Sequence, residues 1–514
     1  MSGKVLMVQG TMSSVGKSLL VAALCRIFKQ DGWRVAPFKA QNMALNSYVT
    51  RDGREIGRAQ AMQAAAAGID VTVEMNPVLI KPEADSFAQI VVMGRPWARQ
   101  SARDYFDRRQ ELWATVTGAL DSLRAQYDLV IIEGAGSPVE LNLRRGDLVN
   151  MAIAAYADAP VLLAGDIDRG GIFAQLLGTL MLLDPSERAR VRGLIVNKFR
   201  GDIDLFADGV TILEQRGAVP VLGVVPFIRD LQIADEDSVA LDERQDGAAK
   251  QADAGLPIQG LDIVVIRLPH ISNFDDFDPL RAEAGVKVRF VDHPADLGYP
   301  DLIIVPGTKT TVADLAWMGE RGLAQRIVAL VAEGVPVLGI CGGYQMLGVA
   351  INDPLHVESD QDAVEGLRLL PLVTTFAATK QTLRAEARVL ADYGLFAGIG
   401  ALAISGYEIH MGDTAPLREM APFLQITKRG DQSTSETDGT ISADGRVVGT
   451  YLHGLFDNDG LRHAILRELA TRKGLAWTPA ASRFDREAAY EQLAATVRAS
   501  LDLKRLQAIV MRGD

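Results

Sequence analysis

Short runs of apolar residues recur along the first half of the chain, with amphipathic stretches between most of them. They lie at residues 5–8, 34–38, 89–93, 127–132, 160–164, 193–196 and 220–225. A continuous apolar run of this length is typical of a strand that is buried on both faces. Because the runs recur at helix-sized intervals, they predict an α/β fold with a doubly wound parallel sheet over residues 1–241.

A second set of apolar runs follows, at residues 261–267, 286–291, 301–305, 335–340 and 447–452. Residues 242–260 are polar and rich in Gly and Ala, as expected of an interdomain linker. We therefore predict a second α/β domain over residues 261–458 and a helical tail over residues 459–514. Four apolar residues of the tail recur at helical spacing: Tyr490, Leu493, Val497 and Leu501. Such a face is more typical of packing on the body than of recruiting a partner.

Composition narrows the class of protein. The 514 residues are 48% hydrophobic and 23% charged, with a net charge of −12, which disfavours nucleic acid and anionic membranes as partners. Two cysteines, Cys25 and Cys341, allow no disulfide framework and no cysteine-based zinc site, which fits a reducing cytoplasm. No apolar run reaches about 18 residues, and no signal-peptide pattern opens the chain. The sequence does not decide between a monomer and a homo-oligomer.

The first predicted strand runs into the loop GTMSSVGKS, from Gly10 to Ser18, and an amphipathic helix follows. Strand, glycine-rich loop and helix form the phosphate-binding arrangement, in which backbone N–H groups surround phosphate. Lys17 would reach the terminal phosphates, and the Ser18 hydroxyl suits Mg²⁺. We expect Gly10, Thr11, Gly16, Lys17 and Ser18 to bind ATP. Thr11 stands where the common motif has its first glycine.

Polar side chains follow the carboxyl ends of other predicted strands, where open α/β sheets bind ligands. Glu133 ends the clearest buried strand, and we expect it to hold Mg²⁺ together with Ser18. Capping of the next turn is its alternative role. Lys39, Asp147 and Asp166 are further candidates for the substrate, phosphate or metal site, although solvated loops also account for such residues.

The second half is organised around Cys341, in VPVLGICGGYQMLG. Gly342 and Gly343 permit a sharp turn between a strand and a helix. The sequence G-x-C-x-G is the cysteine version of a nucleophile elbow, and it places the thiol at a helix N-terminus that favours the thiolate. A small buried cysteine in a glycine-rich turn is the alternative. His453 follows another predicted strand, so it could meet Cys341 at one edge of the sheet.

Together these motifs resemble the cobyric acid synthase family. The similarity runs from residue 4 to about residue 456 and includes FKAQNMALNSYVT, MNPVLIKP, EGAGSPVELNL, GDIDRGGIFA, NKFRGD and PGTKTTVADL. The first half is similar to dethiobiotin synthetase-like, ATP-dependent domains. The second half resembles class I glutamine amidotransferases.

The resemblance implies a cytoplasmic ligase of cobalamin biosynthesis. Such an enzyme uses ATP, Mg²⁺ and glutamine to amidate the b, d, e and g carboxylates of adenosylcobyrinic acid a,c-diamide, and the product is adenosylcobyric acid. Cys341 would attack the glutamine amide, with His453 as its acid–base partner. Backbone N–H groups at Gly342 and near Gly307 would bind the oxyanion. Asn197 would lie near the adenine, and Lys39 near a phosphate or substrate carboxylate.

One position departs from most class I amidotransferases, which carry an acidic residue two positions after the histidine. In this sequence Leu455 holds that position. Cobyrinate-type amidotransferases also lack the acid, so the resemblance is kept. The sequence does not identify the group that orients His453. Glu408 and His410 are conceivable helpers. The competing hypotheses are a cobyrinic acid a,c-diamide synthase, a partitioning-type ATPase switch without amidotransferase activity, and a plain glutamine hydrolase.

Overall fold

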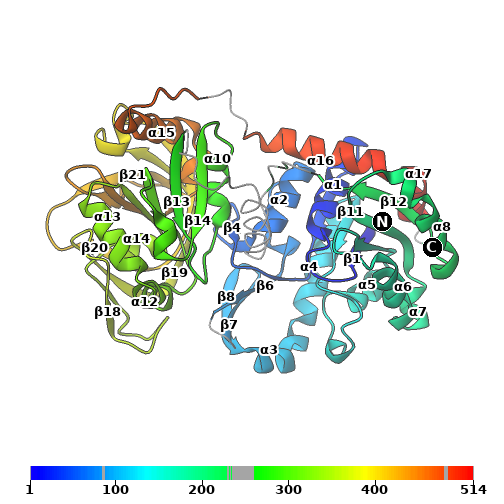
Figure 1. The fold of residues 1–514 in the computed structure, drawn as a ribbon. Coiled ribbons are helices and arrows are strands. Elements are labelled where there is room, and N and C mark those ends of the chain that lie inside the picture. Colours follow the sequence, from blue (N-terminus) through cyan, green and yellow to red (C-terminus); the bar gives the residue numbers. More distant parts are fainter. Residues whose placement is uncertain are drawn as a thin grey trace. The chain divides into compact units, whose positions relative to one another are not determined.

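The computed structural model describes residues 2–83, 87–228, 231, 233, 260–479 and 484–512. Contacts divide the chain into two compact units (Figure 1). Unit 1 comprises Met1–Ala44, Glu55–Glu236 and Asp485–Asp514, and unit 2 comprises Leu45–Arg54 and Asp237–Phe484. The chain therefore enters unit 2 briefly near residue 50, returns to unit 1, and enters unit 2 again after residue 236.

Unit 1 is built on a six-stranded parallel sheet in the order β12-β11-β10-β1-β9-β2. Its strands are β1 (Lys4–Gly10), β2 (Val35–Phe38), β9 (Leu129–Glu133), β10 (Val161–Asp166), β11 (Val191–Phe199) and β12 (Val221–Pro226). β1 lies inside the sheet, and strands that come later in the chain lie on both sides of it. This order confirms the predicted doubly wound sheet.

Helices connect these strands: α1 (Lys17–Gln30), α2 (Arg58–Ala67), α3 (Ala102–Arg108), α4 (Trp113–Gln126), α5 (Met151–Ala157), α6 (Ile172–Leu182), α7 (Pro185–Arg188) and α8 (Ala207–Gly217). α16 (Arg486–Ser500) packs along α1, and α17 (Leu503–Arg512) follows it (Figure 1). The four spaced apolar residues of the predicted tail belong to the same buried cluster as Leu20 and Leu24 of α1, which confirms their packing role. Cys25 is buried in this cluster, and burial raises the pKa of its thiol, so it remains protonated.

Unit 1 also contains a four-stranded sheet, most of which the sequence pattern did not predict. Its order is β3-β6-β7-β8, with β3 (Gln41–Met43), β6 (Val78–Pro82), β7 (Phe87–Val92) and β8 (Arg95–Ser101). Only β7 was expected, as residues 89–93. β8 has the sequence RPWARQS and is mostly exposed, so it lacks the apolar run that marks a buried strand.

Unit 2 is centred on a mixed sheet of 13 strands, counted over the described residues. Its parallel part has the order β14-β13-β15-β16-β24, with β13 (Leu261–Ile266), β14 (Val286–Val291), β15 (Leu302–Val305), β16 (Val337–Ile340) and β24 (Val447–Thr450). The remaining strands, mostly antiparallel, are β17 (Ala350–Asn352), β18 (Ala363–Glu365), β19 (Leu372–Val389), β20 (Ala403–Pro416), β21 (Ala421–Arg429), β22 (Gln432–Ser433), β23 (Thr437–Ile441) and β25 (Leu452–His453). The helices are α10 (Asp278–Arg281), α11 (Pro294–Leu297), α12 (Thr311–Glu320), α13 (Leu323–Ala332), α14 (Gly342–Met346) and α15 (Asp459–Lys473).

The units divide the chain differently from the predicted domains in two places. The predicted tail, residues 459–514, is shared, because α15 belongs to unit 2 whereas α16 and α17 belong to unit 1. Leu45–Arg54 lies within the first half of the sequence and yet belongs to unit 2. An amphipathic pattern shows that a segment packs, but not on which body it packs. Of the predicted linker, residues 242–259 lie outside the described residues.

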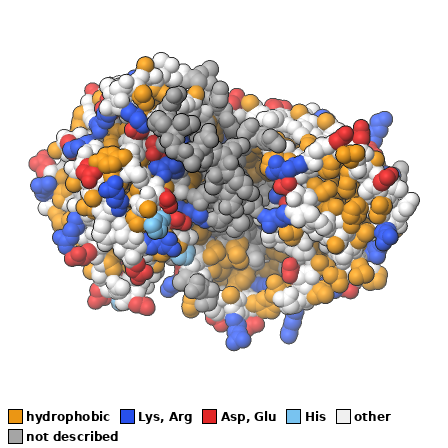
Figure 2. Space-filling view, viewed as in Figure 1, with side chains coloured by type: hydrophobic (Ala, Val, Ile, Leu, Met, Phe, Trp, Pro, Cys, Tyr) orange, Lys and Arg blue, Asp and Glu red, His pale blue; other side chains and the backbone are white. Residues whose placement is uncertain are grey.

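The face that Figure 2 shows carries charged side chains of both signs. There, Lys and Arg side chains are intermixed with Asp and Glu (Figure 2). Within the described part of the chain, no helix combines the length and apolar character needed to cross a membrane.

Candidate active sites

The loop after β1 has the backbone of a phosphate cradle. Ser14 (φ 59°) and Gly16 (φ 93°) both adopt left-handed conformations. A Cβ on Gly10 would lie 2.6 Å from a Val15 methyl carbon and 2.9 Å from Lys17 Nζ, so this close approach requires glycine. The loop leads into α1, and the N-terminus of a helix favours a bound anion.

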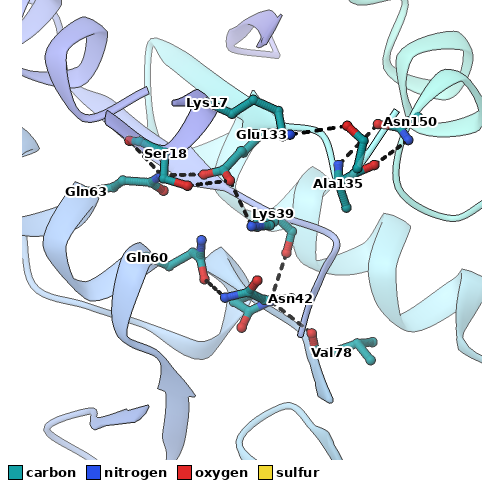
Figure 3. Close-up of polar contacts among 12 residues, drawn as sticks. Lys17, Ser18, Lys39, Asn42, Gln60, Gln63, Val78, Glu133, Ala135 and Asn150 are labelled. Carbon is teal, nitrogen blue, oxygen red and sulfur yellow. Dashed lines mark hydrogen bonds and ion pairs between the residues drawn. The ribbon is translucent and has the colours of Figure 1, made fainter. Parts of the chain in front are cut away.

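Lys17 and Ser18 are held by groups that a ligand could replace. Lys17 Nζ donates to the carbonyl oxygens of Met12 (3.0 Å) and Gly136 (3.2 Å). Ser18 Oγ donates to Glu133 Oε1 at 2.9 Å (Figure 3). The ammonium and the hydroxyl thus lie beside the cradle, one suited to phosphate and the other to a cation.

Glu133 is the centre of a buried polar cluster at the end of β9 (Figure 3). Its side chain accepts hydrogen bonds from Lys39 Nζ (2.8 Å) and Gln63 Nε2 (2.5 Å). Because the carboxylate is only 1% exposed, the Lys39 ammonium offsets a charge that would be costly to bury alone. The structure therefore brings Lys39, predicted from its position after a strand, to the predicted metal ligand.

The cluster contains oxygen atoms that fit a magnesium ion. Ser18 Oγ and Glu133 lie together, and Gln63 Oε1 is buried without a hydrogen-bond partner among the described residues. Mg²⁺ usually takes one or two protein carboxylates and completes its shell with water and nucleotide phosphates. The described residues include no group of three or more His, Cys, Asp or Glu side chains suited to hold a metal by themselves.

Sequence reasoning missed Gln63. It belongs to α2, whose sequence RAQAMQAAAA has the small side chains of a packing helix. The available signal was a pair of glutamines, Gln60 and Gln63, among these small side chains. The structure buries both glutamines fully. Gln60 Oε1 accepts from Asn42 Nδ2 at 3.2 Å (Figure 3), so the amide cluster extends to the segment after Lys39.

Two other predicted residues contact the phosphate loop or its neighbours. Asn197, at the end of β11, donates from Nδ2 to the Val15 carbonyl at 2.7 Å. Asp166, at the end of β10, is buried and pairs with Lys198 Nζ at 2.9 Å. The same ammonium donates to the Ser14 carbonyl. These contacts join the ends of two strands to the loop.

Asp147 has a different environment. Its carboxylate accepts the backbone N–H groups of Val149 (2.9 Å), Asn150 (3.1 Å) and Ala152 (3.0 Å). Three such bonds fix the loop at the start of α5. The structure thus gives Asp147 a role in shaping the loop, and its proximity to a substrate stays a prediction.

In unit 2, Cys341 lies at a sharp turn between β16 and α14. Its backbone has φ 53° and ψ −111°, a conformation that residues other than glycine rarely adopt. A Cβ on Gly343 would lie 1.9 Å from the Val305 carbonyl oxygen, so only glycine fits there. The Cys341 Sγ donates to the Ile409 carbonyl at 3.3 Å. Backbone strain of this kind is typical of a nucleophile elbow.

His453 lies beside this thiol and is 1% exposed. Its imidazole interacts electrostatically with the Cys341 side chain, and its Nδ1 lies 2.7 Å from Asp276 Oδ2. Asp276 Oδ1 accepts the Gly454 N–H at 3.0 Å. Burial lowers the pKa of His453, but the charge and hydrogen bond of Asp276, and then the Cys341 side chain, outweigh burial and raise the pKa to about 10.

Asp276 therefore holds the imidazole in the absence of an acid at position 455. It comes from the 3-10 helix η5 (Phe274–Phe277), 177 residues before His453. Leu455 is fully buried in the hydrophobic core, so it has no polar role. The signal available in the sequence was the acidic pair in NFDDFD, which begins six residues after the predicted strand 261–267.

The two helpers considered from sequence lie elsewhere. Glu408 bonds Arg429 Nε at 2.8 Å, and the His410 ring stacks on Tyr451 at 3.8 Å between ring centroids. Tyr407 of β20 pairs with His453 of β25, and their rings stack. Because side chains alternate along a strand, Glu408 and His410 point to the opposite face of β20. They line a separate polar cavity of about 410 Å³.

Two glycine-containing turns enclose the thiol and the imidazole. A Cβ on Gly307 would lie 2.9 Å from His453 Cε1, and one on Gly342 would lie 3.2 Å from the Thr308 backbone nitrogen. Both turns thus lie beside the reacting pair, and the oxyanion role of their backbone N–H groups stays a prediction.

Comparison with known proteins adds the family to this geometry. Residues 6–240 match the family model of the CobQ/CobB/MinD/ParA nucleotide binding domain, and residues 262–461 match that of the CobB/CobQ-like glutamine amidotransferase domain. A cobyric acid synthase of Chloroflexus aggregans is 55% identical over 94% of both chains. Cobyric acid synthases of Sorangium cellulosum and Dehalococcoides mccartyi are 52% and 50% identical over 99% of both chains. The chain belongs to the cobyric acid synthase family.

Membership of the cobyric acid synthase family identifies the chain as an amide-forming enzyme of cobalamin biosynthesis. Unit 1 holds most of the matched nucleotide-binding domain, and unit 2 holds all of the matched glutamine amidotransferase domain. The predicted fold class is thereby confirmed in both halves. A partitioning-type switch leaves the matched amidotransferase domain unexplained.

Proposed function

We propose that the enzyme uses ATP and glutamine to amidate the b, d, e and g carboxylates of adenosylcobyrinic acid a,c-diamide, giving adenosylcobyric acid. The observation that carries this proposal is the presence of two distinct reaction sites in one chain. One is the buried set of Cys341, His453 and Asp276. The other is the phosphate loop with the cluster around Glu133. The similarity to cobyric acid synthases, 50% and 52% identity over 99% of both chains, supports the choice of substrate.

In unit 2, Cys341 would attack the side-chain amide carbon of glutamine. Cys341 attacks as the thiolate, paired with the protonated imidazole of His453, and the oxyanion is held by N–H groups at Gly342 and near Gly307. His453 then gives its proton to the departing nitrogen, so ammonia leaves and a glutamyl thioester remains. The same imidazole activates a water molecule that hydrolyses the thioester to glutamate. Asp276 keeps the ring oriented throughout.

In unit 1, a carboxylate must be activated, because hydroxide and oxide are poor leaving groups. Bound ATP supplies the phosphoryl group that converts the acid to an acyl phosphate, which ammonia can attack. Lys17 and the loop N–H groups would bind the phosphates. Ser18 and Glu133 would hold Mg²⁺, and Asn197 would lie near the adenine. Lys39 exchanges its bond to Glu133 for a bond to the substrate carboxylate or phosphate.

The decisive experiment offers the purified enzyme two corrinoids, each with ATP, Mg²⁺ and glutamine. Mass spectrometry then counts the amides formed. We expect four further amides on adenosylcobyrinic acid a,c-diamide. Amidation only at a and c of cobyrinic acid would overturn the proposal in favour of the diamide synthase. ATP hydrolysis with neither corrinoid amidated nor glutamine hydrolysed would favour a nucleotide switch.

A further inference from the structure

One segment of the nucleotide-binding half folds with the amidotransferase unit. Leu45–Arg54 belongs to unit 2, although it is preceded in the chain by β3 and followed by β5 (Glu55–Gly57), both in unit 1. It contains β4 (Ser47–Val49) and the sequence NSYVT, for which the proposed function has no use. We call Leu45–Arg54 the Tyr48 segment.

The Tyr48 segment reaches His453 through one aromatic ring. The rings of Tyr48 and Tyr407 are 5.6 Å apart between centroids. Tyr407 in turn stacks on the imidazole of His453, at 5.3 Å and an interplanar angle of 14°. Val49 is fully buried in a cluster with Tyr407 and Ile409, and the Ile409 carbonyl accepts the Cys341 thiol. The segment therefore packs behind both members of the thiol–imidazole pair.

The segment also holds the loop that carries Asp276. The Ser47 N–H donates to Asn273 Oδ1 at 2.8 Å. Asn273 has φ 53° and begins the turn into η5, three residues before Asp276. A side-chain acceptor at this turn fixes the position of the carboxylate that bonds His453.

A further anchor comes from β19. Arg384 Nε donates to the Val49 carbonyl at 2.9 Å, and its guanidinium lies 5.3 Å from the centroid of the Tyr48 ring. At the tip of the segment, a Cβ on Gly53 would lie 3.0 Å from the Thr382 carbonyl oxygen. The segment is thus fastened along its length to unit 2 and does not behave as a loose connection.

We propose that the Tyr48 segment positions His453 and Asp276 for glutamine hydrolysis, and that it makes this step sensitive to the nucleotide-binding half. The inference rests on the proposed function of Cys341 and His453. Tyr48 acts through Tyr407, so it is a positioning residue. A displacement of about 1 Å at a reacting group can cost about 10²-fold in rate. A residue that supports His453 only through Tyr407 therefore has a measurable effect on the rate.

Covalent continuity supplies the sensitivity. Lys39 precedes the segment in the chain, Gln63 follows it, and both bond Glu133. Binding of a nucleotide, a cation or a substrate carboxylate at Glu133 must rearrange these bonds. Because the segment lies between the two residues in the sequence, their movement is transmitted to its ends. We expect ATP and the corrinoid to raise the rate of glutamine hydrolysis through this link.

The test uses three variants of the full chain. Tyr48→Ala removes the ring, and Tyr48→Phe keeps it. Asn273→Gly retains the left-handed backbone and removes only the acceptor of the Ser47 N–H. Tyr299→Ala is the matched control, because Tyr299 is a 63% exposed tyrosine of the same unit. Glutamine hydrolysis is measured with and without ATP and corrinoid, and amidation is measured with ammonium salt.

For Tyr48→Ala and Asn273→Gly we expect kcat for glutamine hydrolysis to fall about 10-fold, with KM little changed. Stimulation by ATP and corrinoid is expected to be lost, whereas amidation with ammonium stays normal. Carbon-13 histidine NMR of the six histidines should show the pKa of His453 shifted downward, toward its usual value. Tyr48→Phe and Tyr299→Ala should match the wild type.

Normal kcat and normal stimulation in both variants would overturn this inference alone, because wild-type glutamine hydrolysis would still support the proposed function. A wild-type enzyme without Cys341-dependent glutamine hydrolysis would instead overturn the proposed function. If Tyr48→Ala does not fold, Asn273→Gly decides the matter.

Discussion

The two sites differ in how much of each is already assembled by the chain itself. In unit 2 the nucleophile, the imidazole and the orienting carboxylate are in contact and almost fully buried. In unit 1 the ammonium groups of two lysines are bonded to groups that a ligand must displace. Lys17 bonds the carbonyl oxygens of Met12 and Gly136, and Lys39 bonds the carboxylate of Glu133.

The difference follows from the chemistry. A thiol needs only neighbouring side chains to become a nucleophile, so its site can be preorganised. Phosphoryl transfer needs a nucleotide and a cation, and before they bind, the chain must neutralise its own charges. The buried ion pair of Lys39 with Glu133 does this in unit 1. One site is therefore complete, and the other is ready for two ligands.

The largest expected effect separates the two sites completely. Cys341→Ala should reduce glutamine-dependent amidation by roughly 10⁴-fold or more, because only a cysteine forms a thioester and the other cysteine, Cys25, is buried in the cluster around α1. Amidation with ammonium salt should continue, which a coupled assay for ADP would measure. Loss of amidation with both nitrogen sources would mean that Cys341 is structural.

The reciprocal change removes the ammonium of the phosphate loop. Lys17→Met should reduce amidation by about 10³-fold with glutamine and with ammonium alike, because charge on the transferring phosphoryl group loses a preorganised cation. Basal glutamine hydrolysis should survive. Its disappearance in this variant would show that the amidotransferase site depends on the phosphate loop for its structure.

A smaller effect is expected where the orienting carboxylate is replaced. Asp276→Asn should lower kcat for glutamine hydrolysis at least about 10²-fold, because the amide no longer favours the imidazolium or fixes the tautomer. The pKa of His453 should fall in the same variant, as histidine NMR would report. Asp275→Asn, on the neighbouring residue, tests whether a general loss of negative charge has the same effect.

The third oxygen of the metal cluster should make a modest contribution. Gln63→Leu is expected to weaken Mg²⁺ or Mn²⁺ binding in the presence of nucleotide by about 10-fold, since one oxygen near the ion is lost. Manganese EPR measures this affinity without turnover. Gln60→Leu is the matched control on the same helix, and equal weakening in both variants would argue against direct contact with the ion.

The smallest effect concerns stability. Because the folded pKa of His453 is raised from 6.5 to about 10, its protonated form stabilises the fold fully below pH 6.5. This contribution is lost as the pH rises toward 10. The difference in melting temperature between the wild type and His453→Gln should therefore shrink between pH 6.5 and 10. His356→Gln, at an exposed histidine, should show no such trend.

Features that depend on contiguous residues were predictable from the sequence. The strands of both parallel sheets, the phosphate loop and the cysteine elbow each occupy one short stretch, so a local pattern contains them. Glu133 and His453 were predicted from strand ends, because parallel strands bring their carboxyl ends to one edge. The structure places both beside the predicted partners, Ser18 and Cys341.

Features that join distant residues were not predictable. Asp276 bonds His453 across 177 residues, and no periodicity relates the two positions. The Tyr48 segment contains the apolar residues of a short strand, but its sequence does not reveal that it packs on Tyr407. Glu408 and His410 were considered because they are polar residues of the strand-like segment GYEIHMG, whereas the alternation of β20 turns them away from the site.

The end of the chain completes the fold of its beginning. α16 and α17 share a buried cluster with α1, Lys4 Nζ donates to the Met511 carbonyl, and the Asp502 N–H donates to Leu222. During synthesis, the apolar face of α1 therefore stays uncovered until the ribosome has made the amidotransferase half and then α16 and α17. A gene split at the interdomain linker would separate α1 from its covering helices. An expressible nucleotide-binding fragment should instead carry residues 485–512 grafted behind β12.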